Sequence, residues 1–178
     1  FGQGMEVNVK DVAVSWLPLY HDMGLIGAWL GNLYHGIPIV ILSPLTFLIR
    51  PERWLWAIHY HRATISGSPN FAYELCIRKI DEKSIEGLDL SSWRLAANGA
   101  EAINPSTIRR FAEKFSCYGF NPRAQFPVYG LAETAVALTF PPLNREPRID
   151  KINREDFEKK SLIIPAGDKE AHFLEFVS

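Results

Sequence analysis

The sequence predicts an α/β fold in which a mostly parallel sheet is flanked by helices and followed by a charged, insertion-like tail. Short strand-like runs alternate with helical patterns of about ten to fifteen residues, and this alternation favours right-handed crossovers between parallel strands. The 178 residues are 47% hydrophobic and 22% charged, which suits one domain with a buried core. After Pro141-Pro142 the composition shifts, because residues 141–178 hold 15 of the 39 charged side chains. We therefore expect an α/β subdomain over residues 1–140 and an insertion-like segment over residues 141–178.

The first predicted crossover joins a strand over residues 12–16 to a buried strand over residues 37–42. Pro18 ends the first strand, and residues 21–35 then show the spacing of a helix. The apolar side chains on one helix face are Met23, Ile26, Trp29, Leu30 and Leu33, and a second stripe consists of Gly24, Gly27 and Gly31. Glycine in a helix costs about 1 kcal/mol relative to alanine, so the stripe predicts a close approach by another backbone or by a long, flat ligand. The residues leave both uses open.

The same alternation continues along the chain. Gly36 ends the first helix, and Arg50-Pro51 opens the next, because proline is tolerated at the first helical position. A strand over residues 63–66 leads to Ser68-Pro69, which we expect to cap the following helix. The side chains that share a face are Trp54, Ile58 and His61 on the first of these helices and Ala72, Leu75 and Cys76 on the second.

The last predicted crossover ends at an aromatic residue. A strand over residues 93–97 is followed by an Asn98-Gly99 turn, and a strand over residues 125–128 stops at Tyr129. Between them, Asn104-Pro105 is expected to cap a helix. The apolar face of that helix carries Ile108, Phe111, Ala112 and Phe115.

Three loops are predicted at the carboxyl ends of parallel strands. They span Gly67–Asn70, Asn98–Glu101 and Tyr129–Glu133. Ligands of open α/β sheets bind in the crevice beyond these ends, so we expect the three loops to meet around one site.

The run Tyr129-Gly-Leu-Ala-Glu-Thr134 places an aromatic ring and a carboxylate immediately after a strand. The ring can cover one face of a nucleobase. The Glu133 carboxylate can hold Mg²⁺ against phosphate oxygens, since a hard cation takes oxygen ligands. The alternative is a tyrosine buried at the strand end, with Glu133 capping the next turn.

Composition and missing motifs disfavour several classes of function. A net charge of −1 without a basic stripe argues against nucleic acid or an anionic membrane as partner. No apolar stretch approaches the length of a membrane span, and Cys76 and Cys117 indicate reduced thiols in a cytoplasmic protein. Neither Ser66 nor Ser68 lies in a Gly-x-Ser-x-Gly elbow, and the chain has no P-loop sequence. Because residue 1 is not methionine, we expect a segment of a longer protein.

Three motifs carry a resemblance to a known superfamily. Trp16-Leu-Pro-Leu-Tyr-His-Asp-Met-Gly-Leu25 precedes Asn98-Gly-Ala-Glu-Ala-Ile103, and both precede the run at Tyr129. Over residues 10–178 the chain resembles the adenylate-forming, or acyl-activating, enzymes, and the first motif is similar to that of fatty acyl-AMP ligases. The resemblance implies one subdomain of the large N-terminal domain of these enzymes. It also implies activation of a medium- or long-chain fatty acid to acyl-AMP, with ATP and Mg²⁺, for transfer to an acyl carrier protein or to a carrier domain of a polyketide or peptide synthase.

The resemblance assigns a nucleotide-binding role to two segments. The residues expected to contact the nucleotide are Asn98, Gly99, Ala100, Glu101, Tyr129, Gly130, Leu131 and Ala132. Tyr129 would stack on adenine, and Gly99 would let the main chain approach the base edge and the ribose closely. Many superfamily members have threonine where this chain has Ala132, and the fatty acyl-AMP ligase branch is similar to this sequence in having alanine.

The resemblance also implies the catalytic and acyl-binding residues. Glu133 would coordinate Mg²⁺, and His21 would donate a hydrogen bond to charge developing near the carboxylate and the α-phosphate. The alternative for His21 is that it forms a helix cap together with Asp22. The acyl slot would be lined by Trp29, Leu30, Leu33 and Phe71, which the residues alone equally allow as plain core.

Other parts of the superfamily's active site fall outside the chain. The phosphate loop would lie before residue 1, and the ribose-binding aspartate and the lysine of the mobile C-terminal domain would lie after residue 178. We therefore expect the isolated polypeptide to be inactive, and the full-length parent to be an ATP-dependent acid ligase.

The tail resembles an extra stretch of fatty acyl-AMP ligases that is associated with exclusion of coenzyme A. Within it, only residues 161–164 and 172–177 are strand-like. The alternative is an ordinary surface connection between subdomains. Two other functions stay open for the chain: a fragment of a fatty acyl-CoA synthetase, and a non-catalytic nucleotide-binding or assembly module.

Overall fold

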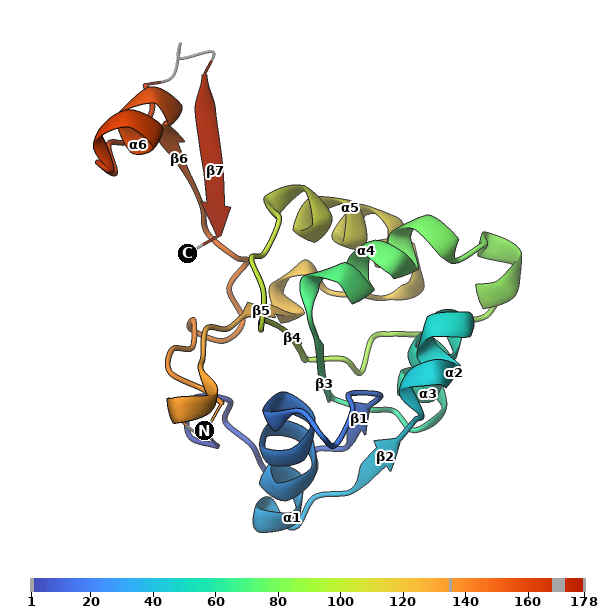
Figure 1. The fold of residues 1–178 in the computed structure, drawn as a ribbon. Coiled ribbons are helices and arrows are strands. Elements are labelled where there is room, and N and C mark those ends of the chain that lie inside the picture. The colour runs from blue at the N-terminus through green and yellow to red at the C-terminus, as the bar shows by residue number, and fades with distance from the viewer. Residues whose placement is uncertain (1, 135, 168–171, 178) are drawn as a thin grey trace.

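The computed structural model describes residues 2–134, 136–167 and 172–177, and Figure 1 shows their fold. Its centre is a five-stranded parallel sheet with strand order β2-β1-β3-β4-β5, which confirms the predicted fold class. The strands are β1 (Ala13–Ser15), β2 (Ile39–Ile41), β3 (Ile65–Ser68), β4 (Leu95–Asn98) and β5 (Gln125–Pro127). Each of them overlaps a run predicted as a strand.

Helices cover both faces of this sheet (Figure 1). They are η1 (Met23–Leu30), a π-helix continued by α1 (Gly31–His35), then α2 (Pro44–Ile49), α3 (Glu52–Tyr60), α4 (Asn70–Lys79) and α5 (Pro105–Phe115). A further helix, α6 (Arg154–Lys160), belongs to the tail. Short 3₁₀ turns are η2 (Glu82–Ile85), η3 (Ser116–Tyr118), η4 (Pro122–Ala124) and η5 (Ala132–Thr134). The sequence analysis missed α2, although proline at its start is a helix signal. Among the described residues, no helix is both long and apolar enough to cross a membrane.

The two predicted helix caps have different outcomes. Asn104 caps α5 as predicted, because its side chain accepts a hydrogen bond from the Ser106 amide at 2.9 Å. The predicted cap at Ser68 is wrong. Ser68 is the buried last residue of β3, and its position before Pro69 favours this extended conformation.

The apolar faces predicted for α3, α4 and α5 are largely the buried ones. The fully or nearly buried side chains among them are Trp54, Ile58, Ala72, Cys76, Ile108, Phe111 and Phe115. Leu75 and Ala112 are half-buried, whereas His61 is exposed at the end of α3. Both cysteines are free thiols, and burial raises the pKa of the Cys76 thiol.

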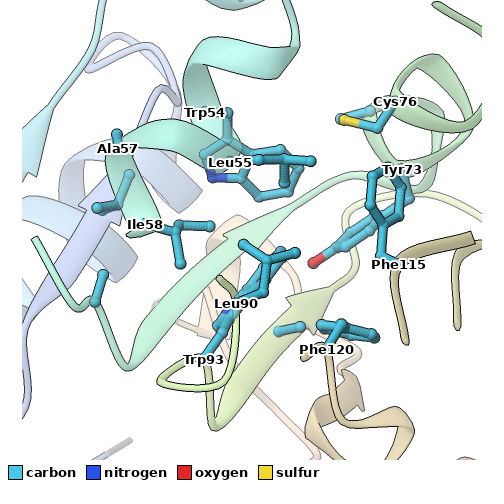
Figure 2. Packing of buried hydrophobic residues seen from close by; sticks show 14 of the residues in the cluster. Trp54, Leu55, Ala57, Ile58, Tyr73, Cys76, Leu90, Trp93, Phe115 and Phe120 are labelled. Atoms are coloured by element: carbon cyan, nitrogen blue, oxygen red, sulfur yellow. The ribbon is translucent and has the colours of Figure 1, made fainter. Parts of the chain in front are cut away.

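One face of the sheet packs against α3, α4 and α5 through a dense aromatic core, which Figure 2 shows from close by. The rings of Trp54 and Trp93 meet edge-on at 5.3 Å, and Phe111 stands edge-on to Trp93 at 6.2 Å. Ser66 ties this layer to the sheet. Its hydroxyl accepts a hydrogen bond from the Trp54 indole at 2.8 Å and donates one to the Val14 carbonyl at 2.6 Å. Such aromatic contacts contribute stability beyond that of the buried area.

The opposite face is covered by η1, α1, the N-terminal segment and the chain after β5. Its smaller core cluster consists of Met5, Ile37, Ile65, Leu95 and Phe126. Ile65 points away from the face that carries Ser66, because successive side chains of a strand alternate between the two faces. Packing on this side is incomplete and leaves a cavity.

The first helix buries a different side from the one predicted. Its expected apolar face is exposed by 38% to 68% at Ile26, Trp29, Leu30 and Leu33. Gly24 is buried instead, and a Cβ at this position would lie 2.3 Å from the carbonyl oxygen of Pro18. The physical reason lies in η1. A π-helix bonds residue i to residue i+5, so its side chains do not follow the 3.6-residue period that the prediction assumed.

A salt bridge and hydrogen bonds connect the N-terminal segment to the amino edge of the sheet. The Arg94 guanidinium donates to both carboxylate oxygens of buried Asp11 and to the carbonyl of Met5. Burial by itself raises the pKa of Asp11, but hydrogen bonds from Arg94, the Asn8 amide and Thr64 outweigh burial and hold that pKa below its ordinary value.

The tail forms a small unit of its own. Strands β6 (Ile149–Asn153) and β7 (Phe173–Val177) pair antiparallel, and α6 lies between them in the chain. The predicted strand over residues 172–177 is confirmed, whereas the one over residues 161–164 is absent, and the sequence analysis missed β6 and α6. Figure 1 shows this unit of β6, α6 and β7 projecting beyond α5. An ion pair of 2.5 Å between Arg109 on α5 and Glu175 on β7 connects it to the main body.

Candidate functional site

A cavity of about 320 Å³ lies between the sheet and the first helix. It runs along η1 and α1, which connect β1 to the parallel strand β2 and therefore run opposite to both strands. The start of η1 thus lies at the carboxyl edge of the sheet, and the end of α1 lies at the amino edge. Because the cavity is lined by residues from both places, it reaches from the predicted nucleotide loops to the far end of the helix. Its volume is in the range of pockets that bind small molecules.

Five of the residues predicted for the site line this cavity at its carboxyl-edge end. They are His21, Ala100, Gly130, Leu131 and Ala132. The other residues predicted to bind nucleotide or metal lie beside them in the same loops and do not line it: Asn98, Gly99, Glu101, Tyr129 and Glu133.

The four residues predicted for the acyl slot do not line the cavity. Phe71 is 44% exposed and meets the edge of the Trp16 ring at 6.0 Å, while Trp29, Leu30 and Leu33 lie on the exposed side of the helix. The structure places the glycine side of that helix, with Ala28 between the glycines, along the cavity. The role of the four residues stays a prediction.

The glycine stripe was the signal in the sequence for this wall. Gly24 serves a close backbone contact, whereas Gly27 and Gly31 line the cavity. The approach of another backbone is therefore observed at Gly24, and the approach of a ligand stays a prediction for Gly27 and Gly31. The sequence analysis had no signal for the residues at the far end, which are Met5, Val7, Asn32, His35 and Phe140.

Hydrogen bonds hold the three predicted loops side by side. The Glu101 carboxylate accepts from the Phe71 amide at 2.6 Å, at the start of α4, where a helix dipole favours negative charge. The Asn70 side chain accepts from the Asn104 amide at 3.2 Å. The Val128 amide donates to the Asn98 carbonyl at 2.8 Å. The loops that follow β3, β4 and β5 thus form one connected edge.

The backbone of the loop after β4 has a restricted geometry. Ala100 has a φ of 67°, in the left-handed region that residues other than glycine rarely adopt. A Cβ on Gly99 would lie 2.7 Å from the carbonyl oxygen of Val128. The main chain therefore comes very close to its neighbour here, and Ala100 holds a strained conformation of the kind found at ligand sites.

The run after β5 presents its ring and its carboxylate to the outside. Tyr129 is 58% exposed, which excludes the alternative of a tyrosine buried at the strand end. Its backbone pairs with Thr139, so the chain folds back immediately after the run. Gly130 lies against the segment that folds back. Glu133 is exposed on η5.

The geometry of the His21-Asp22 pair is that of a helix cap. The Asp22 carboxylate accepts a hydrogen bond from the Met23 amide at 2.8 Å. The Nδ1 atom of His21 accepts from the same amide at 3.1 Å and lies 2.8 Å from the Asp22 carboxylate oxygen, so both side chains hold the start of η1, and the catalytic role of His21 stays a prediction. His21 lines the end of the cavity at the carboxyl edge.

Comparison with known proteins gives consistent matches. The family described as AMP-binding enzyme matches residues 1–156. A medium-chain-fatty-acid–[acyl-carrier-protein] ligase of Teredinibacter turnerae is 40% identical over 160 residues, which are 90% of this chain and 25% of that protein. A 4-hydroxyphenylalkanoate adenylyltransferase of Mycobacterium tuberculosis is 40% identical over 145 residues, 82% of this chain and 23% of that protein. The chain thus spans about a quarter of the length of these curated relatives.

A solved structure agrees with these matches. The fatty acyl-adenylate ligase of L. pneumophila, determined in complex with acyl adenylate and pyrophosphate, superimposes with a TM-score of 0.95 and 40% identity. The superposition covers 99% of this chain and 31% of the other.

Proposed function

Since the chain belongs to the AMP-binding enzyme family, we propose that it is part of a fatty acyl-AMP ligase, which activates a medium- or long-chain fatty acid with ATP and passes the acyl group to an acyl carrier protein. The names of the relatives support the substrate class and the acceptor. These names also differ at the distal end of the acid, which is an alkyl chain in one relative and a hydroxyphenyl ring in another.

One observation carries this proposal: a single cavity connects the nucleotide loops with an elongated space along a helix. At one end lie Ala100 and the Gly130-Leu131-Ala132 segment, and along its length lie Gly27 and Gly31. An acyl-adenylate has the same two parts, a nucleotide and a long apolar chain. The acyl chain of such a molecule would lie along the helix, with the nucleotide at the carboxyl-edge end of the cavity against the three loops.

The residues at the carboxyl edge fit an ATP molecule with Mg²⁺. The exposed Tyr129 ring has a face available for adenine, and Gly99 and Ala100 bring main-chain groups to the loop where the base edge would bind. The Glu133 carboxylate is exposed and would contribute one oxygen ligand to Mg²⁺, with phosphate oxygens as further ligands. ATP supplies the activated phosphate. These residues bind and orient it.

His21 would act on the charge that develops during adenylation. In that step a carboxylate oxygen of the fatty acid bonds to the α-phosphorus, the bond from the α-phosphorus to the bridging oxygen breaks, and pyrophosphate leaves. Because the Nδ1 atom of His21 accepts from the Met23 amide, the other ring nitrogen, Nε2, would donate a hydrogen bond to the α-phosphate oxygens at this end of the cavity.

For the tail we propose that residues 141–178 form the segment that excludes coenzyme A, appended to a subdomain over residues 1–140. The separate pairing of β6 with β7 and the Arg109–Glu175 ion pair support an appended unit with a fixed position. Deleting the tail from the longer protein should then increase the use of coenzyme A as acceptor. No increase would favour a plain surface connection.

The proposed location is the cytoplasm, where ATP is present and where Cys76 and Cys117 stay reduced.

The test is fatty-acid-dependent release of pyrophosphate from ATP by the longer protein that contains these residues. We expect Gly31→Leu to lower it by at least about tenfold, because a leucine side chain would fill the cavity and a pocket discriminates by this order per methylene group. The matched variant Leu33→Ala changes a side chain on the exposed side of α1. It should leave the rate within about twofold, because it removes no contact of the cavity lining. The 178-residue polypeptide alone should release no pyrophosphate.

Two results would contradict the proposal. If the longer protein releases no pyrophosphate with any fatty acid, the proposed activation of a fatty acid is wrong. If Gly31→Leu has no effect while Leu33→Ala abolishes the rate, the acyl chain lies on the exposed side of the helix.

A further inference from the structure

The far end of the cavity carries polar side chains at a place where an alkyl chain would need none. Asn32 and His35 line it near the end of α1, beside the apolar Met5, Val7 and Phe140. Two hydroxyls elsewhere in the lining are already used. The Ser15 hydroxyl accepts from the Leu17 amide, and the Ser66 hydroxyl bonds Trp54 and Val14.

The two polar residues differ in the hydrogen bonds that they make. The Asn32 amide donates to the Ala28 carbonyl within its own helix. The His35 ring lies against the backbone of Gly2, where an added Cβ would come within 2.3 Å of Cε1 and Nε2, and it contacts the Tyr34 ring at 5.1 Å. Within the described part of the chain, the His35 imidazole has no hydrogen-bond partner. A neutral imidazole offers one donor and one acceptor.

His35 stands at the opposite end of the cavity from the reacting groups. His21 lies just before the start of η1, at the carboxyl edge of the sheet, and His35 is the last residue of α1, at the amino edge. A fatty acid whose carboxylate lies near His21 would therefore direct its ω end towards His35.

The geometry points to fatty acids with a hydroxyl group at the ω end as a substrate class, with His35 as the residue that determines this specificity. The inference rests on the proposed function and adds the nature of the chain terminus. A hydroxyl that leaves water for an apolar pocket without a partner loses its hydrogen bonds at a high cost, whereas a partner at the right place offsets that cost. His35 is such a partner, because its imidazole can donate a hydrogen bond to the hydroxyl oxygen or accept one from the hydroxyl group.

The experiment measures binding and adenylation of matched acids by the longer protein. A series of ω-hydroxy fatty acids with 8 to 16 carbons is compared with methyl-terminated acids that have one more carbon, so that a hydroxyl replaces a methyl group in a chain of equal extent. Calorimetry without ATP gives the Kd, and pyrophosphate release gives kcat/KM. We expect at least one chain length at which the hydroxy acid binds as tightly as its methyl partner or up to about tenfold more tightly, the range of one hydrogen bond.

Variants of His35 then assign the preference to one side chain. His35→Phe keeps a ring and removes both hydrogen-bonding groups, so the hydroxy acid should bind at least about tenfold more weakly than its methyl partner. His35→Gln restores a donor and an acceptor and should recover most of the preference. The control His61→Phe changes an exposed histidine at the end of α3, outside the cavity, and should alter nothing.

The outcomes separate this inference from the proposed function. Normal adenylation of methyl-terminated acids, with no hydroxy acid matching its partner at any length, would overturn the inference alone. A preference that persists unchanged in His35→Phe would do the same, and methyl-terminated acids serve in that variant as the measure of correct folding. Absence of binding and adenylation for every acid would reject the proposed function itself.

Discussion

The two faces of the sheet are built from the same five strands, yet one face is packed and the other is hollow. On the packed face, Trp54, Trp93 and Phe111 exclude solvent almost completely. On the hollow face, the helix turns glycines towards the strands and leaves a cavity of about 320 Å³. Because strand side chains alternate between faces, each strand contributes to both. The comparison teaches that one side of the sheet provides the stable core and the other side provides the cavity, although each strand is only three to four residues long.

The largest expected effect tests the packed side. Trp54→Ala should lower the free energy of unfolding by about 3–5 kcal/mol, because it removes a fully buried ring and leaves a void. The Ser66 hydroxyl would also lose the indole donor. Urea unfolding followed by circular dichroism measures the change. The control Tyr60→Ala, at a side chain 71% exposed on the same helix, should stay within about 0.5 kcal/mol, and equal losses in both variants would refute the assignment.

The next effect sharpens the comparison within one helix. Gly24→Ala should destabilise the fold by about 1–3 kcal/mol, since its Cβ would collide with the Pro18 carbonyl. Gly31→Ala should instead stabilise by up to about 1 kcal/mol, because alanine is the better helix former and Gly31 lines the cavity. Thermal unfolding of the two variants measures both changes. Shifts of the same sign would contradict the division of roles among the glycines.

A smaller effect concerns the carboxyl edge, where the two faces meet. Glu101→Ala should cost about 0.5–2 kcal/mol, comparable to the loss of a helix cap, because the Phe71 amide loses its acceptor. If Glu101 also positions the nucleotide loop, the KM for ATP should rise more than kcat falls. Glu101→Gln keeps an acceptor oxygen and should recover most of the stability. An unaltered stability in Glu101→Ala would show that the hydrogen bond from the Phe71 amide to Glu101 does not stabilise this edge.

The smallest expected effect is a pH dependence of the unfolding free energy. It arises at the amino edge of the sheet and not from either face. The pKa of Asp11 is lowered in the fold, so the unfolded chain binds a proton at higher pH than the folded chain. The stability that Asp11 contributes is therefore complete above its ordinary pKa of 3.8 and is lost as the pH falls through the lower folded value. Unfolding free energies measured from pH 6 downward should decline less steeply in Asp11→Asn than in the parent sequence. Parallel curves would show that Arg94 does not favour the ionised form.

The packed face could be predicted from the sequence because its elements obey simple periods. Trp54 and Ile58 recur at helical spacing on α3, and Asn104-Pro105 marks the start of α5. In both places the structure agrees with the sequence prediction. The hollow face escaped prediction for a related reason. Its helix begins as a π-helix, and the apolar residues Trp29 and Leu33, which a 3.6-residue period turns inward, point outward.

The candidate site was predictable where backbone chemistry determines it and not where packing does. The loops after β4 and β5 could be placed at one edge from the alternation of strands and helices, and Gly99 and Gly130 within them lie against neighbouring main chain. Asn32 and His35 meet Met5 only in three dimensions, across more than 25 positions of the chain, and no local pattern signals such a wall.

Gly130 has an evolutionary consequence. Any side chain at this position would begin 1.6 Å from the carbonyl oxygen of Val136, so the segment that bears Tyr129 and Glu133 tolerates no other amino acid without being rebuilt. Natural variants of this chain should therefore keep glycine at this position, whatever exchanges occur elsewhere in the lining of the cavity.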